Sequence, residues 1–592
     1  METGKGTFVK TAVLLIFIIS VSAILIGGCQ CKRKKPTDIA TGTDESIPDY
    51  SEEGLPQHPG DWLILGCTST LDKINPFTAS KDIEIDITSL LFNGLLTFDD
   101  EFNLVGDLAE SFKIETIDGK IVVSILLKEG VQWHPYHDTA AGIDLPSLPL
   151  EPEDIQYTFD LIKSGVFGAF LKSFFSGFET VKKVDGRNIT ITLNGASASR
   201  LFLLTAAVLP KKILEQYEDP VSAPFWEKPC GTGPFRFSRW EEDDDRGEQT
   251  LFLEAFESYF GGKPYLSGVK VLRVATSKTL FNLIQSERID FARLPIQMYL
   301  QGMSSVQLNR QYDLTTVPGL SYTFVGFNLD REATPLFQNP KIRQALALAV
   351  NKQVLIDDIL YGFAEPVNGP LSPTFPSYDP DITGIEYDIE KAKALLEDCG
   401  WQDNNNDGFL DRDSDGDGVL ERFEVLLYTN KDYPVREEVA EHITSSWKLL
   451  GIDAAAHRES WEVLEQEILP RGSFSAVLIE WNHGPWPAMD TLWRSPTSQT
   501  DVGTFFSYSN SQVDGLLTNL AAETNQANRR EIIKQLYQMI QNDIPGIFLY
   551  SRTQPVIIHR RFKGRVRKLS PLGAIGNTQA WFVPEKWQLS RD

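Results

Sequence analysis

The residues whose types and spacing most directly indicate chemistry lie in an acidic segment, DNNNDGFLDRDSDGDGVLERFE, at positions 403–424. Oxygen-bearing side chains recur there at alternate positions and are followed by a glycine, as in a twelve-residue loop that wraps a calcium ion. The ligands of that loop would be, in chain order, Asp413, Asp415, Asp417, the carbonyl of Val419, Glu421 and the bidentate Glu424. The segment therefore predicts a calcium site, and the alternative is a hydrated acidic turn without an ion.

The surroundings of this segment limit what calcium could do there. A second acidic run, Asp403-x-Asn405-x-Asp407-Gly408, begins just upstream, but Ser414 stands where its closing glutamate is required. A helix-like segment precedes the loop and the strand-like FEVLLYT follows it, so the paired helices of a calcium sensor are not indicated. Calcium would therefore stiffen a helix-to-strand turn rather than define the function.

Motifs of catalysis and nucleotide binding are not found in the sequence. There is no GxSxG, no HExxH and no Walker loop, and the near misses at 195–199 and 231–233 lack the final glycine. We expect a binding protein that is not an enzyme and needs no cofactor for its function. The alternative from another class is a calcium-dependent surface enzyme or adhesin.

Composition and charge further limit the architecture and the partners that this protein could have. A chain of 592 residues is long enough for two or more lobes, and its 42% hydrophobic content suits a packed globular protein. The formal net charge of −25 repels nucleic acid and anionic lipid headgroups, so we expect neither as a partner.

The first 60 residues predict export and a tether. Lys5 and Lys10 precede a charge-free apolar run that ends in Ile26-Gly27-Gly28, directly before Cys29. This pattern predicts a lipoprotein signal peptide over 1–28, lipidation of Cys29, and a polar, flexible tether over 29–60. The alternative is an uncleaved membrane helix, since basic residues follow at 32–35. The expected location is the cell envelope, facing the periplasm or the exterior.

The elements of the body mix strand and helix throughout. The segment 120–133 alternates like a half-buried strand, and helices are predicted from Asn339-Pro340 onward, over 389–400 and over 529–543. This mixture predicts α/β lobes. Cys67, Cys230 and Cys399 are widely spaced and suit three buried thiols, with one long-range disulfide left open.

Distinctive blocks follow one another along this body: TLDKINPF, LLFNGLLTFDDEFNLVGDLAESF, CGTGPFRFSRW, VGFNLDREATPLFQNPKIRQALALAV, YDIEKAKALLEDCGW and YQMIQNDIPGIFLY. In order and spacing they resemble the solute-binding proteins of peptide-type ABC transporters, the dipeptide- and oligopeptide-binding family known as bacterial extracellular solute-binding family 5. The resemblance runs from about Leu71 to Phe582.

The resemblance implies a two-lobed α/β fold of the type II periplasmic-binding-protein class, with a hinge and a ligand cleft between the lobes. Lobe I would cover 61–318, with 551–592 returning to it, and lobe II would cover 319–550 and contain the acidic loop. The implied function is capture of di- or oligopeptides by a monomer that delivers them to a membrane permease. A solute such as an oligosaccharide, a metal chelate or a signalling compound is the alternative within the family.

The resemblance also implies ligand-contacting residues. Peptide-binding members place a tryptophan in lobe II, followed closely by an aspartate that pairs with the α-ammonium of the peptide. Trp481 matches the tryptophan, but Asn482 and His483 follow it, so the carboxylate would come from Glu480 or Asp490. The candidate ligand-binding residues are therefore Asn75, Glu480, Trp481, His483 and Asp490.

Overall fold

The computed structural model describes residue 48 and residues 50–589, except 169–170, 173–174, 196, 414–415, 432, 485–486, 488, 497–505 and 566–572. By its internal contacts the chain from Pro48 onward forms one unit. The predicted signal peptide and Cys29 lie outside the described residues. Within the described part of the chain, each helix falls short of the length and apolarity needed to cross a bilayer.

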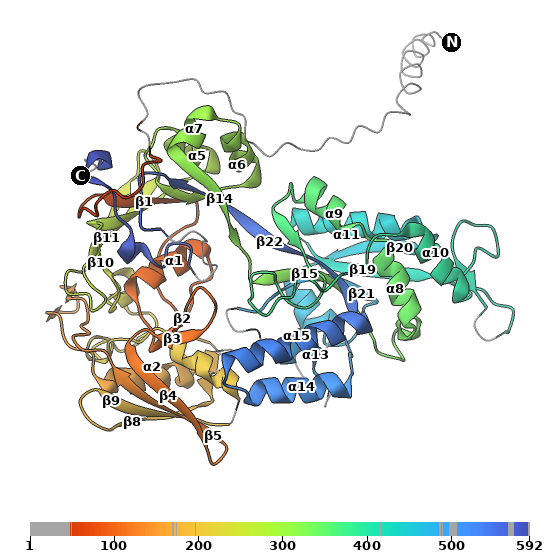
Figure 1. Ribbon diagram of the computed structural model, residues 1–592, viewed down its shortest axis with the longest axis horizontal. Helices are drawn as coiled ribbons and strands as arrows, with labels where there is room; N and C mark the ends of the chain where they lie inside the picture. Colours follow the sequence, from red (N-terminus) through yellow and green to blue (C-terminus); the bar gives the residue numbers. More distant parts are fainter. Residues whose placement is uncertain are drawn as a thin grey trace, which may run out of the picture. The chain divides into compact units, whose positions relative to one another are not determined.

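A twelve-stranded sheet forms the centre of the molecule (Figure 1). Its main path runs, in spatial order, through β10 (Phe235–Asp243), β11 (Glu248–Ala255), β12 (Gly268–Arg273), β1 (Trp62–Cys67), β13 (Phe291–Arg293), β22 (Gly546–His559), β15 (Ser321–Phe327), β21 (Ala476–Asn482), β19 (Glu424–Asn430) and β20 (Asp453–Glu459). Two further strands, β14 (Tyr312–Pro318) and β16 (Ala364–Pro366), also pair with β22.

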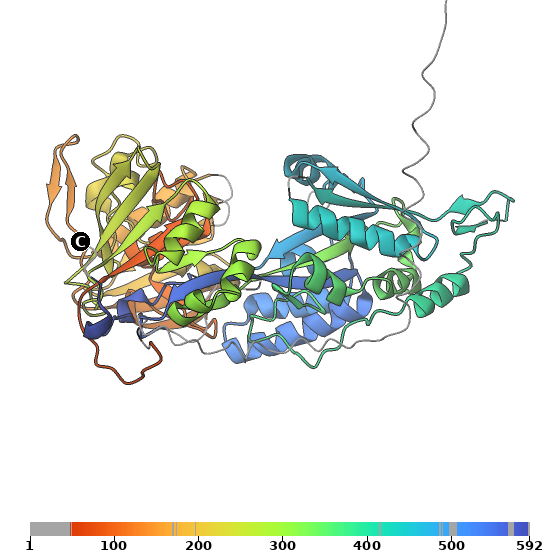
Figure 2. The same cartoon turned by 90° about the horizontal axis from the view of Figure 1, so that it is seen from above.

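The long strand β22 joins two groups of strands (Figure 2). Its carboxyl half pairs with β14, from Thr553 opposite Pro318 to His559 opposite Tyr312. Its amino half pairs with β15 and β16, where Ala364 lies opposite Arg552. The strands on the side of the carboxyl half of β22 form the first half-sheet (β1 and β10–β14). The strands on the side of its amino half form the second half-sheet (β15, β16 and β19–β21).

The chain passes between the half-sheets at two adjacent places, 318–320 and 551–553, which we call the crossover. A Cβ added at Gly319 would lie 2.6 Å from the carbonyl oxygen of Arg552, so the two passing backbones are packed too closely for a side chain. The partners of β22 therefore change at the same place where the two lobes are predicted to meet. The lobe boundaries themselves stay a prediction, because the contacts group this region as one unit.

A smaller antiparallel sheet lies apart from the central one, in the order β4 (Ala109–Ile117), β5 (Lys120–Leu127), β9 (Asn188–Leu193), β8 (Phe178–Lys183). The strand predicted within 120–133 is confirmed as β5, with buried residues at alternate positions. Helix α2 (Pro152–Ser164) covers this sheet, and the rings of Phe159 and Phe178 stack at 4.2 Å. Two hairpins complete this part, β2 (Leu96–Phe98) with β3 (Leu104–Gly106) and β6 (Tyr136–Asp138) with β7 (Ile143–Leu145).

The main helices are α1 (Asp82–Leu91), α5 (Ser277–Gln285), α6 (Ile296–Met303), α8 (Pro340–Leu348), α10 (Ile389–Asp398), α11 (Pro434–Lys448), α14 (Ser511–Ala522) and α15 (Gln526–Asp543). The predicted helix after Asn339 is confirmed as α8, and the Asn339 side chain accepts a hydrogen bond from the Lys341 amide. The predicted helix over 389–400 is α10, followed by Gly400 with a φ of +83°. The third, α15, begins earlier than predicted because Asn525 caps it.

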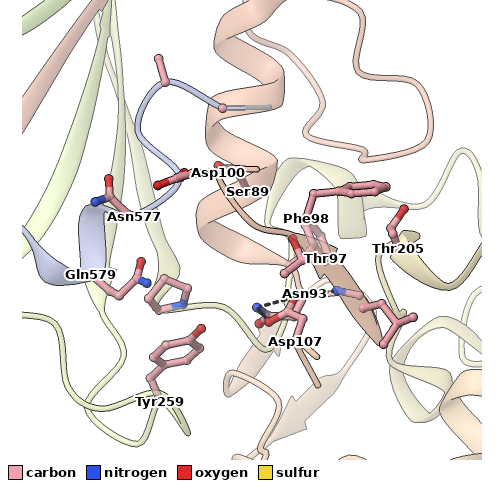
Figure 3. A pocket seen from close by; sticks show the side chains of 17 residues that line it. Ser89, Asn93, Thr97, Phe98, Asp100, Asp107, Thr205, Tyr259, Asn577 and Gln579 are labelled. Atoms are coloured by element: carbon pink, nitrogen blue, oxygen red, sulfur yellow. Dashed lines mark hydrogen bonds between the residues drawn. The ribbon is translucent and has the colours of Figure 1, made fainter. Parts of the chain in front are cut away.

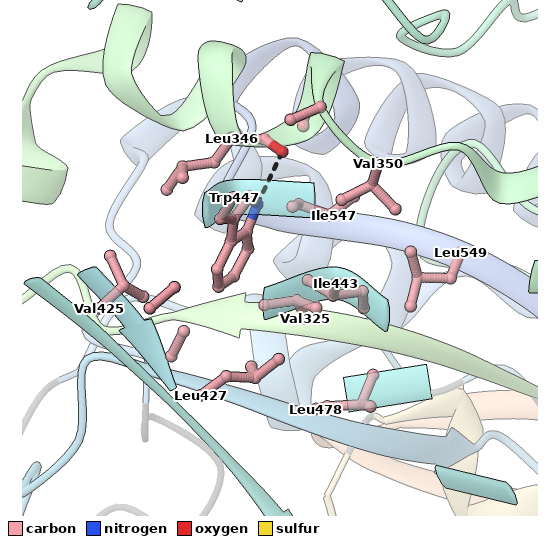
Figure 4. Packing of buried hydrophobic residues seen from close by; sticks show 14 of the residues in the cluster. Val325, Leu346, Val350, Val425, Leu427, Ile443, Trp447, Leu478, Ile547 and Leu549 are labelled. Atoms are coloured by element: carbon pink, nitrogen blue, oxygen red, sulfur yellow. Dashed lines mark hydrogen bonds between the residues drawn. The ribbon is translucent and has the colours of Figure 1, made fainter. Parts of the chain in front are cut away.

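The second half-sheet is buried on both faces, which explains its nearly continuous apolar strands. On one face Val325, Leu478 and Ile547 pack around Trp447 of α11, whose indole N–H donates to the Leu346 carbonyl at 3.1 Å (Figure 4). On the other face an aromatic cluster contains Tyr322, Phe324, Trp493 and Phe548. Strands enclosed by helices in this way confirm the predicted α/β class.

The three cysteines of the body are free thiols. Cys67 and Cys230 are buried, as predicted, whereas Cys399 is only partly buried. Burial raises the pKa of Cys67 to about 11, so this thiol stays protonated at neutral pH.

A buried ion cluster fastens the segment after β22 to the start of β1. The Arg561 guanidinium, with no exposed side-chain surface, pairs with Asp61 and with Asp290 at 2.9 Å. Asp290 also accepts from the Ile64 amide at 3.0 Å, and Asp61 accepts from the Leu589 amide at 3.0 Å. Two carboxylates that are held together in the interior therefore depend on one guanidinium.

Replacing Arg561 by methionine is expected to lower the free energy of unfolding by about 3–5 kcal/mol, because two buried carboxylates lose their counter-charge. The neighbouring Arg560 pairs with Asp313 at 3.2 Å with 38% of its side chain exposed, so Arg560→Met should cost less than about 1 kcal/mol. Equilibrium urea denaturation of both variants measures the difference. Equal losses in the two variants would contradict this account.

Candidate functional site

Glu480 and Trp481 are consecutive on β21 and therefore point to opposite faces of the second half-sheet. Glu480 lies opposite Thr323 and Trp481 lies opposite Tyr322 on the neighbouring strand β15. Trp481 is partly buried against the aromatic cluster, whereas Glu480 faces the other side. These two predicted site residues consequently do not line one common face.

Glu480 is held by three donors. The Ser321 hydroxyl donates to it at 2.5 Å, and the guanidinium groups of Arg436 and Arg552 donate at 2.9 and 3.1 Å. The ring of Tyr433 lies against both guanidinium groups, with centroid distances of 4.7 and 5.3 Å. We call these five residues the crossover cluster, because Ser321 directly follows one passing segment and Arg552 belongs to the other.

The crossover cluster carries a surplus positive charge, since one carboxylate faces two guanidinium groups. Burial raises the pKa of Glu480, but Arg552, the Ser321 hydroxyl and Arg436 outweigh it, and the net effect is a lowered pKa. Glu480 thus stays ionised at neutral pH, and its charge is already matched. An ammonium group brought beside it would meet two cations, whereas a carboxylate would be attracted.

Sequence analysis missed Arg436 and Arg552, because neither belongs to a recognisable motif. One signal for Arg552 was present: it is the sole charged residue in the run IFLYSRTQPVII, which forms most of β22. A charged side chain inside such a strand requires a partner, and that partner is Glu480.

His483 is buried in the aromatic cluster. Its Nε2 lies 2.9 Å from the Pro370 carbonyl oxygen, and its ring centroid lies 5.4 Å from that of Tyr322 and 5.8 Å from that of Phe375. Burial lowers its pKa to about 4, so the imidazole is neutral at physiological pH. Its Nδ1 has no hydrogen-bond partner among the described residues.

Asp490 and Asn75 lie on other elements. Asp490 begins helix α13 (Asp490–Trp493), pairs with Arg494 at 3.1 Å and keeps 42% of its side chain exposed, against 17% for Glu480. Asn75 is buried in the connection from β1 to α1, where its side chain accepts from the Phe77 amide at 2.9 Å. Among the described residues, no hydrogen bond or ion pair joins either of them to Glu480.

A second contact, made by side chains, connects the regions around the two half-sheets. The loop at 99–103, between β2 and β3, places the ring of Phe102 at 5.2 Å from that of Phe375. Arg530 of α15 donates to the Glu101 carbonyl and to the Asn103 side chain, both at 3.0 Å. The regions around the two half-sheets are therefore joined at the crossover and at this side-chain contact.

The predicted calcium loop projects between α10 and β19. Asp413 accepts hydrogen bonds from the amides of Gly416 and Gly418, at 2.7 and 3.1 Å, and Asp417 accepts from the Val419 amide at 2.7 Å. Within the described residues, no three acidic, histidine or cysteine side chains converge to hold a metal. Asp415 lies outside the described residues, so the calcium site stays a prediction.

Comparison with known proteins places this arrangement in context. The family model described as "Bacterial extracellular solute-binding proteins, family 5 Middle" matches residues 103–502. The oligopeptide-binding protein AppA of Bacillus subtilis is 27% identical over 586 residues, which are 97% of this chain and 99% of the relative. Heme-binding protein A of Haemophilus influenzae is 25% identical over 446 residues, which are 74% of this chain and 72% of the relative.

Solved structures confirm the predicted fold class. AppA from Bacillus subtilis in complex with a nonapeptide has a TM-score of 0.63 at 26% identity and covers 89% of this chain and 100% of its own. HbpA2 from Haemophilus parasuis has a TM-score of 0.74 at 20% identity, with 88% and 100% coverage.

Proposed function

Because the chain belongs to the bacterial extracellular solute-binding proteins of family 5, we propose that it captures peptides outside the cytoplasm and delivers them to the permease of an ABC importer. The observation that carries the peptide assignment is the likeness to AppA, an oligopeptide-binding protein, over 97% of this chain. In this proposal the protein acts as a monomer and performs no chemistry on its ligand.

The crossover supplies the hinge that such a function needs. Two adjacent backbone segments join the half-sheets, and a rotation there requires changes at few residues. An open form admits the solute, and closure removes it from water and forms the shape that the permease recognises. The contact of the 99–103 loop with Phe375 and Arg530 supports closure at a second place.

The charges around the second half-sheet suit the two ends of a peptide. The surplus positive charge of the crossover cluster favours the ligand carboxylate. Asp490, which is more exposed, pairs directly with Arg494 and interacts at longer range with Arg529, is the better of the two predicted carboxylates for the α-ammonium. Trp481, Asn75 and His483 remain proposed ligand contacts, which the family resemblance implies. The likeness to a heme-binding protein supports the alternative of a non-peptide solute.

The peptide proposal predicts that protein purified without denaturation retains peptides, detectable by native mass spectrometry. After unfolding and refolding, a peptide identified in this way should bind in calorimetry. Asp490→Ala should weaken it by about tenfold or more, since a charge-assisted hydrogen bond is lost, but should leave its N-acetylated form unaffected. Asp398→Ala is the control, because it removes a carboxylate that also pairs with one cation, Lys341, but lies on α10. A retained heme or sugar, with no peptide, would refute the assignment.

We also propose that the loop at 403–424 binds a structural calcium ion, which the spacing of Asp413, Asp415 and Asp417 supports. Millimolar calcium should then raise the melting temperature, because an ion that binds the folded state stabilises it. Asp417→Asn should abolish the shift, whereas Asp244→Asn, in the exposed acidic turn after β10, should not. Absence of both heat and melting shift in the unmodified protein would exclude the site.

The proposed location is the outer face of a membrane, with the anchor at Cys29. The small residues before Cys29 and the polar segment after it support lipidation. Cys29→Ala should abolish incorporation of labelled palmitate and leave the precursor unprocessed. If the unmodified protein incorporates no palmitate yet remains in the membrane fraction, the uncleaved helix is the correct account.

A further inference from the structure

A polar cavity of about 400 Å³ lies beside α1, apart from the crossover cluster (Figure 3). Its wall combines the end of α1, the strand β2, and the segment 573–579 that follows β22. Its volume lies within the range of about 300–1,000 Å³ that small-molecule pockets occupy. None of the candidate residues derived from the sequence lines it.

The charges of the cavity have one sign. Asp100 and Asp107 contribute carboxylates, and none of the described residues that line it is a lysine, arginine or histidine. Phe92, Phe98 and Tyr259 add aromatic rings, and the faces of such rings attract cations. The lining therefore favours a ligand that is positively charged and has an apolar part.

Asp107 is fixed in orientation by its neighbours. The Asn93 amide donates to its two oxygens at 2.9 and 3.1 Å, and the Gly94 amide donates at 3.1 Å. The Asn93 oxygen in turn accepts from the Thr232 hydroxyl at 3.0 Å, so the amide of Asn93 cannot turn over without losing that bond. A carboxylate has about four acceptor positions, and one remains for a ligand donor.

Asp107 is nevertheless reachable. Burial raises its pKa to about 6, although the hydrogen bonds from Asn93 and Gly94 and the charge of Lys128, which does not line the cavity, oppose that effect. The residue as a whole is only half-buried, because the cavity reaches its side chain. At pH 7 and above, the carboxylate is thus charged in a poorly solvated place, and a bound cation would compensate that charge.

The backbone around the cavity is also constrained. A Cβ added at Gly94 would lie 2.6 Å from the Thr205 carbonyl oxygen, so the start of β2 is packed against this wall. Gly573, on the opposite segment, has a φ of +144°, which other residues rarely adopt. The wall is therefore held by close packing rather than by flexible side chains.

We propose that this cavity is a binding site for a small organic cation, a primary ammonium group on a short apolar stem, which pairs with Asp107. The stem lies against the aromatic rings, and the ammonium donates to the free acceptor position of the carboxylate. This inference does not depend on the peptide proposal, since Asp107 belongs to neither the crossover cluster nor the 99–103 loop. Asp100 lies in that loop, but the contacts with Phe375 and α15 are made by its neighbours Glu101, Phe102 and Asn103.

The test uses benzylamine as the probe and benzyl alcohol as its neutral isostere, with the purified full chain in phosphate buffer. Amine buffers such as Tris are avoided because they carry the same group. Calorimetry should show saturable binding of benzylamine and binding of the alcohol that is weaker by about tenfold or more, since only the cation forms a charge-assisted hydrogen bond. Equal affinity for the two compounds, or no saturation by benzylamine, would overturn the proposal.

Two variants locate the site. Asp107→Asn should weaken benzylamine by about tenfold or more, while Asp244→Asn, in the exposed acidic turn, should have no effect. Because Asp107→Asn disturbs the bond with Asn93, its melting temperature is measured first. If that variant does not fold, Asp100→Asn, an exposed position on the cavity wall, should still weaken the cation more than the alcohol. Unchanged benzylamine affinity in the folded variants would refute the assignment.

A further experiment tests whether the cavity binds a free amine or instead the ammonium group of a captured peptide. In a protein saturated with its retained peptide, benzylamine should bind with the same affinity as in the emptied protein. Loss of benzylamine binding on saturation would show that the cavity is part of the peptide site and would overturn its independence.

Discussion

The sharing of one strand between two half-sheets is the constraint on which the remaining structure depends. β22 cannot shift its register against β14 without also shifting it against β15, because both pairings use the same backbone. The aromatic cluster and the core around Trp447 both pack on strands that are aligned by it. The two parts of the molecule are therefore coupled through main-chain hydrogen bonds, and not only through side-chain contacts.

Two ion clusters use this strand and its continuation in different ways. Arg561, just beyond β22, is fully buried and has a carboxylate on each side, so it acts as a fastening of the chain end. Arg552, within β22, has 40% of its side chain exposed and shares its carboxylate with a second arginine. Around Arg561 two carboxylates face one guanidinium, whereas around Arg552, nine positions earlier, two guanidinium groups face one carboxylate. Only the cluster of Arg552 therefore has positive charge available to a ligand.

Local features were predictable from the sequence, and long-range ones were not. The start of α8 follows from Asn339 and Pro340, since capping depends on adjacent residues alone. The pairing of Glu480 with Arg552 spans 72 positions and depends on the register of β15 between their strands. Family resemblance located Trp481 and Glu480, but not that they face opposite sides of a strand in this chain. The cavity at Asp107 was also missed, because its wall joins 89–107 to 573–579.

The position of the crossover cluster has a consequence for how opening could be observed. In any rotation, atoms near the axis move little and atoms far from it move most. Ser321 and Arg552 are next to the segments that would turn, so distances within the cluster would be nearly the same in open and closed forms. The contact of Arg530 joins α15 to the loop between β2 and β3, elements that lie apart from the crossing of β22 in Figure 1. A pair of probes on the 99–103 loop and α15 would therefore report the angle, whereas a probe at Tyr433 would report only occupancy.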